Sequence, residues 1–161
     1  MEFRVVDFEL ITRHYKSYKD GVDEIEKYKE EVLKKVEPLK KEMNSIIAAA
    51  SGGIVVDTLT QQQRVENFQK LQAEAVELDK EAKFKISKMA NELNEKVYDE
   101  LEELINEWAK ENNIDMIIGK MEVVHVKEQY EVSNQILDIL KEKEIWVEYI
   151  ESKKEKEKES V

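Results

Sequence analysis

An apolar residue recurs every three or four positions along the centre of the chain, and this periodicity constrains the fold more than any other feature. Such a stripe is typical of a long α-helix with one buried face. Its mean step is close to that of a heptad repeat, so a second helix must lie along it. Residues 58–112 would form a helix about 80 Å long. The stripe consists of Val65, Phe68, Leu71, Ala75, Leu78, Ala82, Ile86, Met89, Leu93, Val97, Leu101, Leu104 and Trp108.

A second stripe lies upstream and is the natural partner. The sequence Ser51-Gly52-Gly53 separates the two stripes, and glycine adopts turn conformations at low steric cost. We therefore expect an antiparallel helical hairpin, or coiled-coil arm, over residues 22–112 with its tip near 44–57. The upstream stripe consists of Val22, Ile25, Tyr28, Val32, Val36, Leu39, Met43 and Ile46.

Two local features refine this hairpin. Pro38 lies inside the first predicted helix, where it removes one backbone hydrogen bond and favours a kink. The kink is either a tolerated bend or a hinge that lets the arm flex. The second helix has two possible capping boxes at its start, Thr60 with Gln63 or Thr58 with Gln61.

Composition agrees with long helices and argues against several classes of partner. Charged residues make up 39% of the chain, with four Gly, one Pro and a mean hydropathy of -0.65. The regular stripes argue against general disorder, the other explanation for so much charge. The net charge of -11 without a basic stripe disfavours nucleic acid and anionic lipid as partners. No uncharged apolar run approaches the ~20 residues of a membrane-spanning helix.

Short apolar stretches flank the helical region and predict β-strands at residues 2–7, 115–120 and 122–126. Strands this short are marginal alone, so we expect them to pair with one another and with copies from other chains. The predicted fold class is therefore α+β and mostly α, with a small β body assembled from several chains. The predicted oligomerisation residues are Phe3, Val5, Val6, Met116, Ile117, Ile118, Val123, Val124 and Val126.

The sequence predicts four regions. Residues 1–21 hold the first strand and the root of the body, and residues 22–112 form the arm. Residues 113–150 hold two strands and a terminal helix over 133–143, for which Ser133 is the expected N-cap and Ile136, Leu137, Ile139 and Leu140 face inward. Residues 145–150 either continue that helix or pack beside it. Residues 151–161 form a charged tail predicted to be disordered.

No arrangement of residues points to catalysis. The chain has two histidines, His14 and His125, with no zinc-site spacing, and no cysteine. His125 lies in the strand pattern and is expected to be structural. Phosphate-binding loops and nucleophile motifs are also absent. We expect a protein that is not an enzyme, with no metal and no cofactor.

Two stretches stand out by their charge. Residues 43–56 carry no charged side chain, and among them Ile46, Ile47, Ile54, Val55 and Val56 either close the hairpin on themselves or form an apolar surface that contacts a client. Residues 92–111 contain eight acidic side chains against Lys96 and Lys110, a run that is typical of a solvated helix face.

Several segments are similar to the Skp/OmpH family of periplasmic chaperones. They are the opening Val5-Val6-Asp7, residues 113–118 (NIDMII), residues 122–126 (EVVHV) and residues 131–143 (EVSNQILDILKEK). The resemblance covers residues 2–143. It implies a homotrimer in which strands of three chains form a small barrel. Three helical hairpins would then project like tentacles around a cavity that holds unfolded outer-membrane proteins without ATP.

The chain departs from this family in three respects. Well-known members are basic, whereas this chain is acidic; no signal peptide precedes the first strand; and the Lys/Glu tail lies beyond the similar region. A cytosolic or viral relative would account for all three. The expected location is therefore cytoplasmic, or periplasmic if a leader was removed.

The predicted function is an ATP-independent holdase chaperone, a trimer that grips unfolded or assembling client proteins between its arms. An acidic coiled-coil assembly scaffold of the phage type, which binds one specific partner, is the alternative. A plain coiled-coil adaptor is a third hypothesis.

Overall fold

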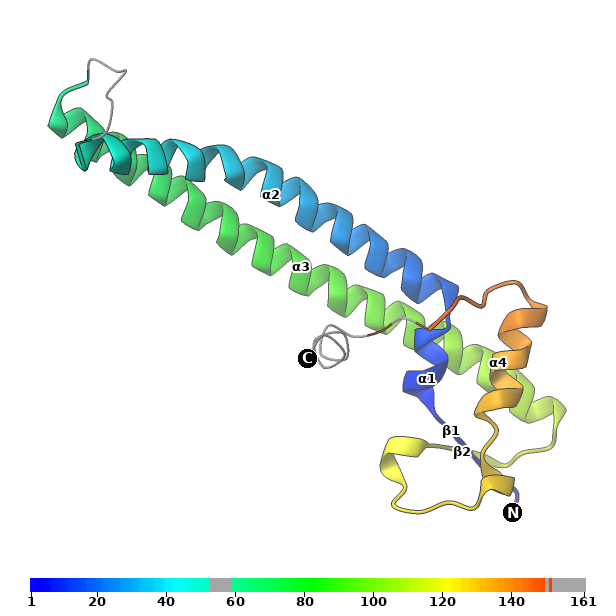
Figure 1. Ribbon diagram of the computed structural model, residues 1–161. Coiled ribbons are helices and arrows are strands. Elements are labelled where there is room, and N and C mark those ends of the chain that lie inside the picture. The colour runs from blue at the N-terminus through cyan, green and yellow to red at the C-terminus, as the bar shows by residue number, and fades with distance from the viewer. Residues whose placement is uncertain (53–58, 150, 152–161) are drawn as a thin grey trace. The chain divides into compact units, whose positions relative to one another are not determined.

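The computed structural model describes residues 1–52, 59–149 and 151. It is mostly helical, with long helices and a small strand part, and it divides into two compact units (Figure 1). Unit 1 comprises Met1–Asp23 and Asn91–Val161, and unit 2 comprises Glu24–Ala90. The elements in chain order are β1 (Phe3–Val6), α1 (Phe8–Arg13), α2 (Lys16–Ala50), α3 (Gln61–Glu111), β2 (Met116–Gly119), the 3-10 turns η1 (Lys120–Glu122) and η2 (Glu128–Tyr130), and α4 (Ser133–Glu142).

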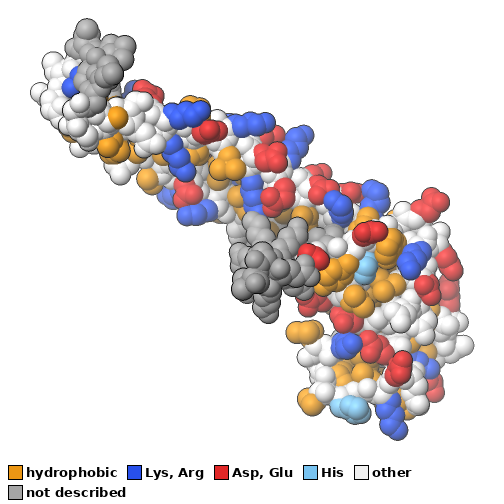
Figure 2. Space-filling model, in the orientation of Figure 1, with side chains coloured by type: hydrophobic (Ala, Val, Ile, Leu, Met, Phe, Trp, Pro, Cys, Tyr) orange, Lys and Arg blue, Asp and Glu red, His pale blue; other side chains and the backbone are white. Residues whose placement is uncertain are grey.

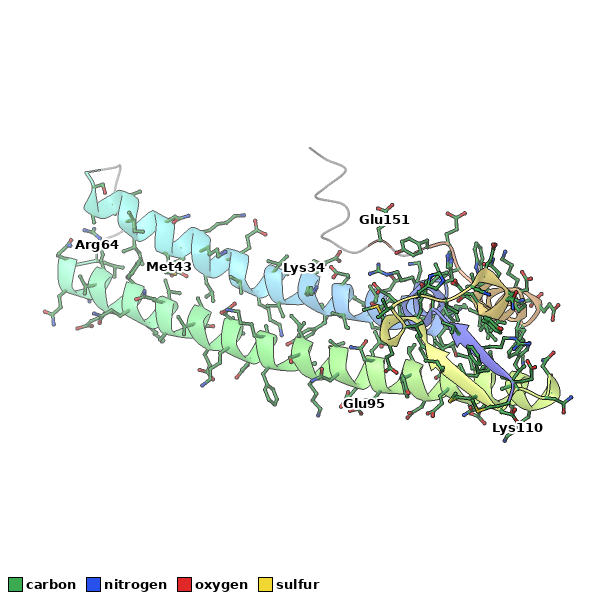
Figure 3. All side chains as sticks on the ribbon, turned by 90° about the horizontal axis from the view of Figure 1, so that it is seen from below. Lys34, Met43, Arg64, Glu95, Lys110 and Glu151 are labelled. Carbon is green, nitrogen blue, oxygen red and sulfur yellow. The ribbon has the colours of Figure 1, made fainter. Side chains whose placement is uncertain are left out.

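Unit 2 is an antiparallel helical hairpin built from α2 and α3, as the two stripes predict (Figures 1 and 3). The stripe residues of this unit are at least half-buried, with the exception of Val65. Between the helices, the ammonium of Lys85 lies 4.3 Å from the ring centre of Tyr28. Because apolar side chains leave water only along this seam, the periodicity of the sequence sets which helix faces meet.

The ends of the long helices follow local sequence signals. The N–H of Thr60 donates to Gln63 Oε1 at 2.9 Å and the N–H of Gln63 donates to Thr60 Oγ1 at 3.2 Å, so the capping box at these residues is confirmed. Thr58 of the other candidate box lies outside the described residues. Gly52 has a φ of 82° just beyond α2, and Asn113 has a φ of 55° beyond α3, as is common where helices end.

Pro38 lies inside α2 without interrupting it, and its side chain is exposed. Its role as a hinge stays a prediction. The start of α2 differs from our expectation, because the helix begins at Lys16 rather than near Val22.

The sheet of unit 1 has two parallel strands, β1 and β2, with Phe3 opposite Met116 and Val6 opposite Gly119. The two apolar stretches that flank the helical hairpin in the sequence therefore pair with each other within one chain. Parallel strands need a long crossover, and here that crossover is the whole helical hairpin. The prediction that these strands pair with one another is confirmed, and their pairing with copies from other chains stays a prediction.

The strand predicted at residues 122–126 is wrong for this chain. Lys120–Glu122 forms η1, and residues 123–127 are irregular. Val124 is fully exposed, and His125 is also exposed rather than held in a strand. A segment rich in β-branched residues forms a strand only where a neighbouring strand supplies hydrogen bonds. No described strand pairs with this segment.

The core of unit 1 brings α1 and α4 against the C-terminal half of α3 and the sheet. The inward face predicted for the terminal helix is confirmed, since Ile136 and Leu140 are fully buried. The core also contains residues that the α3 stripe did not include, Ile105 and Ala109. Its central cluster consists of Val6, Ile11, Tyr15, Val97, Leu101, Ile105, Val132, Ile136 and Leu140.

Ser133 is not the N-cap of α4, contrary to prediction. Val132 precedes the helix, and the buried hydroxyl of Ser133 instead accepts a hydrogen bond from the N–H of Asp7 at 2.8 Å. The carboxylate of Asp7 caps α1 through the N–H of Leu10 at 3.0 Å. The hydroxyl that could cap its own helix thus satisfies a backbone donor from the other end of the chain.

Residues 145–149 pack beside the start of α2 and do not continue α4. Glu144 has a φ of 58°, which ends the helical run. The N–H of Lys16 donates to the carbonyl of Ile145, and the N–H of Val147 donates to the carbonyl of His14, both at 2.8 Å. The imidazole of His14 stacks on Trp146 at 5.3 Å. Of the predicted tail 151–161, only Glu151 is among the described residues.

Candidate functional site

A hollow of about 350 Å³ opens where α2 ends and α3 begins, and we call it the tip groove. It belongs to unit 2. The short side chain of Ala50 lies where the stripe of α2 runs out, which leaves space that larger residues line from both helices. The lining residues are Ile46, Ile47 and Ala50 of α2 and Gln61, Arg64, Val65, Phe68, Gln69 and Gln72 of α3.

The apolar part of this groove is accessible to solvent. Val65 is 47% exposed, a value unusual for a member of the α3 stripe, and Ile47, next to the last residue of the α2 stripe, is 50% exposed. Val65 keeps this exposure because α2 ends close to it and cannot cover it. Apolar side chains gathered in one exposed hollow are typical of an interaction site.

Of the five predicted client-contact residues, the structure brings Ile46 and Ile47 together in the groove. Ile54, Val55 and Val56 lie outside the described residues. Sequence reasoning assigned Val65 and Phe68 of α3 to the buried stripe and missed both them and the carboxamides as groove residues. The available signal was that the α3 stripe begins with Val65 and Phe68, close to where the α2 stripe ends.

The groove differs from the rest of the chain in its charge. None of its described lining residues is Asp or Glu, and Arg64 is the one charged residue among them. Figure 3 labels Arg64 and Met43 on the two helices at this end of the hairpin. The chain has 37 acidic residues, so the absence of Asp and Glu among the described lining residues sets this hollow apart from the rest of the surface. It favours contact with apolar groups.

The two units differ in their net charge. Unit 2 contains twelve acidic and twelve basic residues, whereas unit 1 contains 25 acidic and 14 basic residues and so carries the whole net charge of -11. Along the hairpin, Figure 2 shows the two signs interspersed. The helices of unit 2 therefore present a neutral surface on average.

A second, larger hollow of about 680 Å³ lies in unit 1, over β2, η1 and α3. Its wall includes the rings of Phe8 and Tyr98, stacked at 5.3 Å, and Ile105. Met121 is 87% exposed at its edge.

The predicted oligomerisation residues separate into two groups. Val5 and Val6 are buried in the chain's own core, and Phe3 stacks on Tyr130 at 4.7 Å. The side chains of these three residues make contacts within their own chain. The remaining residues reach the surface to differing degrees and are available to a second copy: Met116, Ile117, Ile118, Val123, Val124 and Val126.

Acidic residues of α3 line a third hollow of about 500 Å³, which Asp99, Glu102 and Glu103 border together with Lys110. Among the described residues, no group of three His, Cys, Asp or Glu side chains is arranged to hold a metal ion. Nor does any described helix combine the length and apolarity needed to cross a membrane.

The sequence was compared with models of known protein families. The family model described as "Outer membrane protein (OmpH-like)" matches residues 2–140, which is most of the chain. No curated protein sequence matches.

Proposed function

Because the chain belongs to the OmpH-like family, we propose that it is an ATP-independent holdase chaperone that binds unfolded or non-native proteins. Members of this family are chaperones rather than enzymes, and they are known for holding unfolded proteins. The observation that supports the proposal for this chain is the tip groove, an exposed apolar hollow whose described lining residues include no Asp or Glu.

Holding a client requires contacts that are favourable but reversible. Burying a large aliphatic or aromatic side chain yields roughly 1.5–3 kcal/mol, so one groove of this size provides weak affinity. Several grooves that act on one client raise the apparent affinity through effective concentration, without any further contact. A neutral hairpin also avoids repelling polypeptides of either charge.

We propose that the chain oligomerises through unit 1. A two-stranded sheet is marginal alone, and an exposed strand edge is a template for another chain. Val124, Met1 and Met121 are the three most exposed large apolar residues described for this unit, and Met121 lies in η1 with Val124 just after it. Assembly into a trimer would cover them and present three hairpins to one client.

The decisive experiment is an aggregation assay with several chemically unfolded proteins, followed by light scattering. The full chain in molar excess should suppress aggregation of all of them, without ATP. Its mass in solution should be that of an oligomer, and a trimer is expected. The absence of suppression for every substrate would exclude the holdase function.

The concentration of negative charge in unit 1 favours one alternative function, that of an assembly scaffold. Unit 1 concentrates 25 acidic residues and could bind a single basic, folded partner. Such a scaffold would co-assemble with that partner and leave the aggregation of unrelated unfolded proteins unchanged. The same light-scattering assay therefore separates the two functions.

A further inference from the structure

We propose that the tip groove binds an extended apolar segment of a non-native polypeptide, flanked by a carboxylate rather than by lysine or arginine. The inference rests on the proposed holdase function and adds to it the chemistry of the recognised segment. It depends on three properties of the groove: its size, its carboxamides and its charge.

The size of the groove limits its occupant to a few side chains. A hollow of about 350 Å³ is near the lower end of the ~300–1,000 Å³ range of ligand pockets. Ile47, Val65 and Phe68 supply the apolar wall. A folded protein surface cannot enter such a space, whereas a short stretch of unfolded chain can insert its apolar side chains.

The carboxamides select for an extended backbone. Gln61, Gln69 and Gln72 line the groove, and each carboxamide offers both donors and an acceptor. An extended segment brings unpaired N–H and C=O groups, which cost free energy if they are buried without partners. An α-helix has already paired its backbone and would leave the three carboxamides unused.

The charge of the groove sets the preference for flanking residues. Arg64 is the one charged residue among the described lining residues. A guanidinium carries five N–H donors, so it can hold a client carboxylate in addition to its contacts within the chain. A lysine or arginine beside the apolar segment would instead meet a like charge.

The same charge argument disfavours a second copy as occupant, because two tips in contact would bring two Arg64 guanidiniums together. The chain's own residues 54–57, Ile-Val-Val-Asp, remain a competing occupant, since they have the composition that the groove prefers. Replacing Ile54, Val55 and Val56 with serine tests this competitor directly.

The test uses three fluorescein-labelled peptides that share one apolar core and carry Asp, Asn or Lys on both sides. Their binding to the full chain is measured by fluorescence anisotropy. The Asp-flanked peptide should bind about fivefold more tightly than the Lys-flanked peptide, and the difference should shrink at high salt. Equal affinity of the two peptides at low salt would overturn the proposal.

Matched variants locate the binding. Ile47→Asp and Val65→Asp should each weaken binding about tenfold, because a carboxylate enters the apolar wall. Leu33→Asp is the control, since Leu33 is 62% exposed in the same unit but does not line the groove. A loss of affinity that is equal in all three variants, all helical by circular dichroism, would contradict a site in the groove.

Two further substitutions test the polar contacts. Gln69→Ala with Gln72→Ala should weaken binding about fivefold or more, whereas Gln62→Ala should leave it unchanged, because Gln62 does not line the groove. Arg64→Gln should abolish the preference for Asp over Lys. The proposal fails if the preference survives this change.

Two measurements complete the test. A benzophenone-bearing peptide should crosslink the unmodified chain at groove residues. Crosslinks confined to unit 1 would show that the peptide does not bind in the groove. A tenfold rise in affinity on replacing Ile54, Val55 and Val56 would assign the groove to the chain's own segment instead of a client. If the chain suppresses aggregation but Ile47→Asp and Val65→Asp suppress it equally well, the inference fails while the holdase function stands.

Discussion

The hydroxyl of Tyr15 donates a hydrogen bond to Oε2 of Glu100 at 2.5 Å, which ties the residue before α2 to α3 within unit 1. Tyr15 is 8% exposed, and its backbone also bridges to Trp146. Three segments far apart in the sequence therefore meet at this residue. Its hydroxyl is positioned by tertiary packing alone.

Tyr15→Phe should destabilise the chain by about 1–3 kcal/mol, because it removes a hydrogen bond to a charged acceptor. Urea unfolding at fixed protein concentration measures this loss. Tyr98→Phe is the control, since Tyr98 is 54% exposed and the substitution keeps its ring, and it should change the free energy of unfolding little.

The contribution of Tyr15 should also depend on pH. Burial, followed by the hydrogen bond and the charge of Glu100, raises the pKa of Tyr15 well above its ordinary value. The unfolded chain loses this proton above pH ~10, while the folded chain keeps it to higher pH. The stability difference between wild type and Tyr15→Phe should thus be complete below pH ~10 and narrow as pH rises above it. A difference that widens with pH would contradict this assignment.

Ser133→Ala should cost about 1–3 kcal/mol, because it leaves the N–H of Asp7 without its acceptor in a partly buried site. Thermal unfolding followed by circular dichroism measures the effect. Ser45→Ala is the matched control: its hydroxyl bonds to the carbonyl of Lys41 on an exposed helix face. Similar losses in both variants would show that the contact with Asp7 contributes little.

Gly21→Ala should destabilise the chain by about 1 kcal/mol, although alanine favours a helix. A methyl group at Gly21 would lie 2.2 Å and 2.8 Å from the two terminal carbons of Leu93 and 3.0 Å from its Cγ. Displacing this side chain costs roughly 1–3 kcal/mol, against ~1 kcal/mol gained in helix propensity.

A double-mutant cycle isolates that clash. In a Leu93→Ala background the methyl group has space, so Gly21→Ala should become stabilising by about 1 kcal/mol. Chemical unfolding of the four proteins provides the measurement. A Gly21→Ala effect of the same size in both backgrounds would rule out contact between the two side chains as its cause.

Val124→Asp should shift the chain from oligomer to monomer without reducing its helix content. The side chain is fully exposed in one chain, so the substitution removes nothing from the core, but it would place a carboxylate in the proposed contact between copies. Light scattering after gel filtration measures the mass. Val76→Asp, at an exposed position of unit 2, serves as the control and should keep the wild-type mass.

The sequence by itself determined the helical hairpin. The stripe from Val65 to Trp108 and the capping box at Thr60 depend on residues three or four positions apart, and such contacts form wherever the helix forms. The end of α3 near Asn113 follows from the same local rules. Part of the tip groove could be predicted in this way, because Ile46 and Ile47 belong to a stretch without charge.

Only the tertiary structure decided the features that depend on contacts between residues distant in the sequence. The segment 122–126 has the β-branched content of a strand but pairs with no described strand, and Ser133 could cap its own helix but accepts from Asp7 instead. The groove likewise needed the end of α2 to be placed beside Phe68 and three glutamines. Periodicity specifies which face of a helix is buried, whereas pairing across the chain depends on the positions of both segments in space.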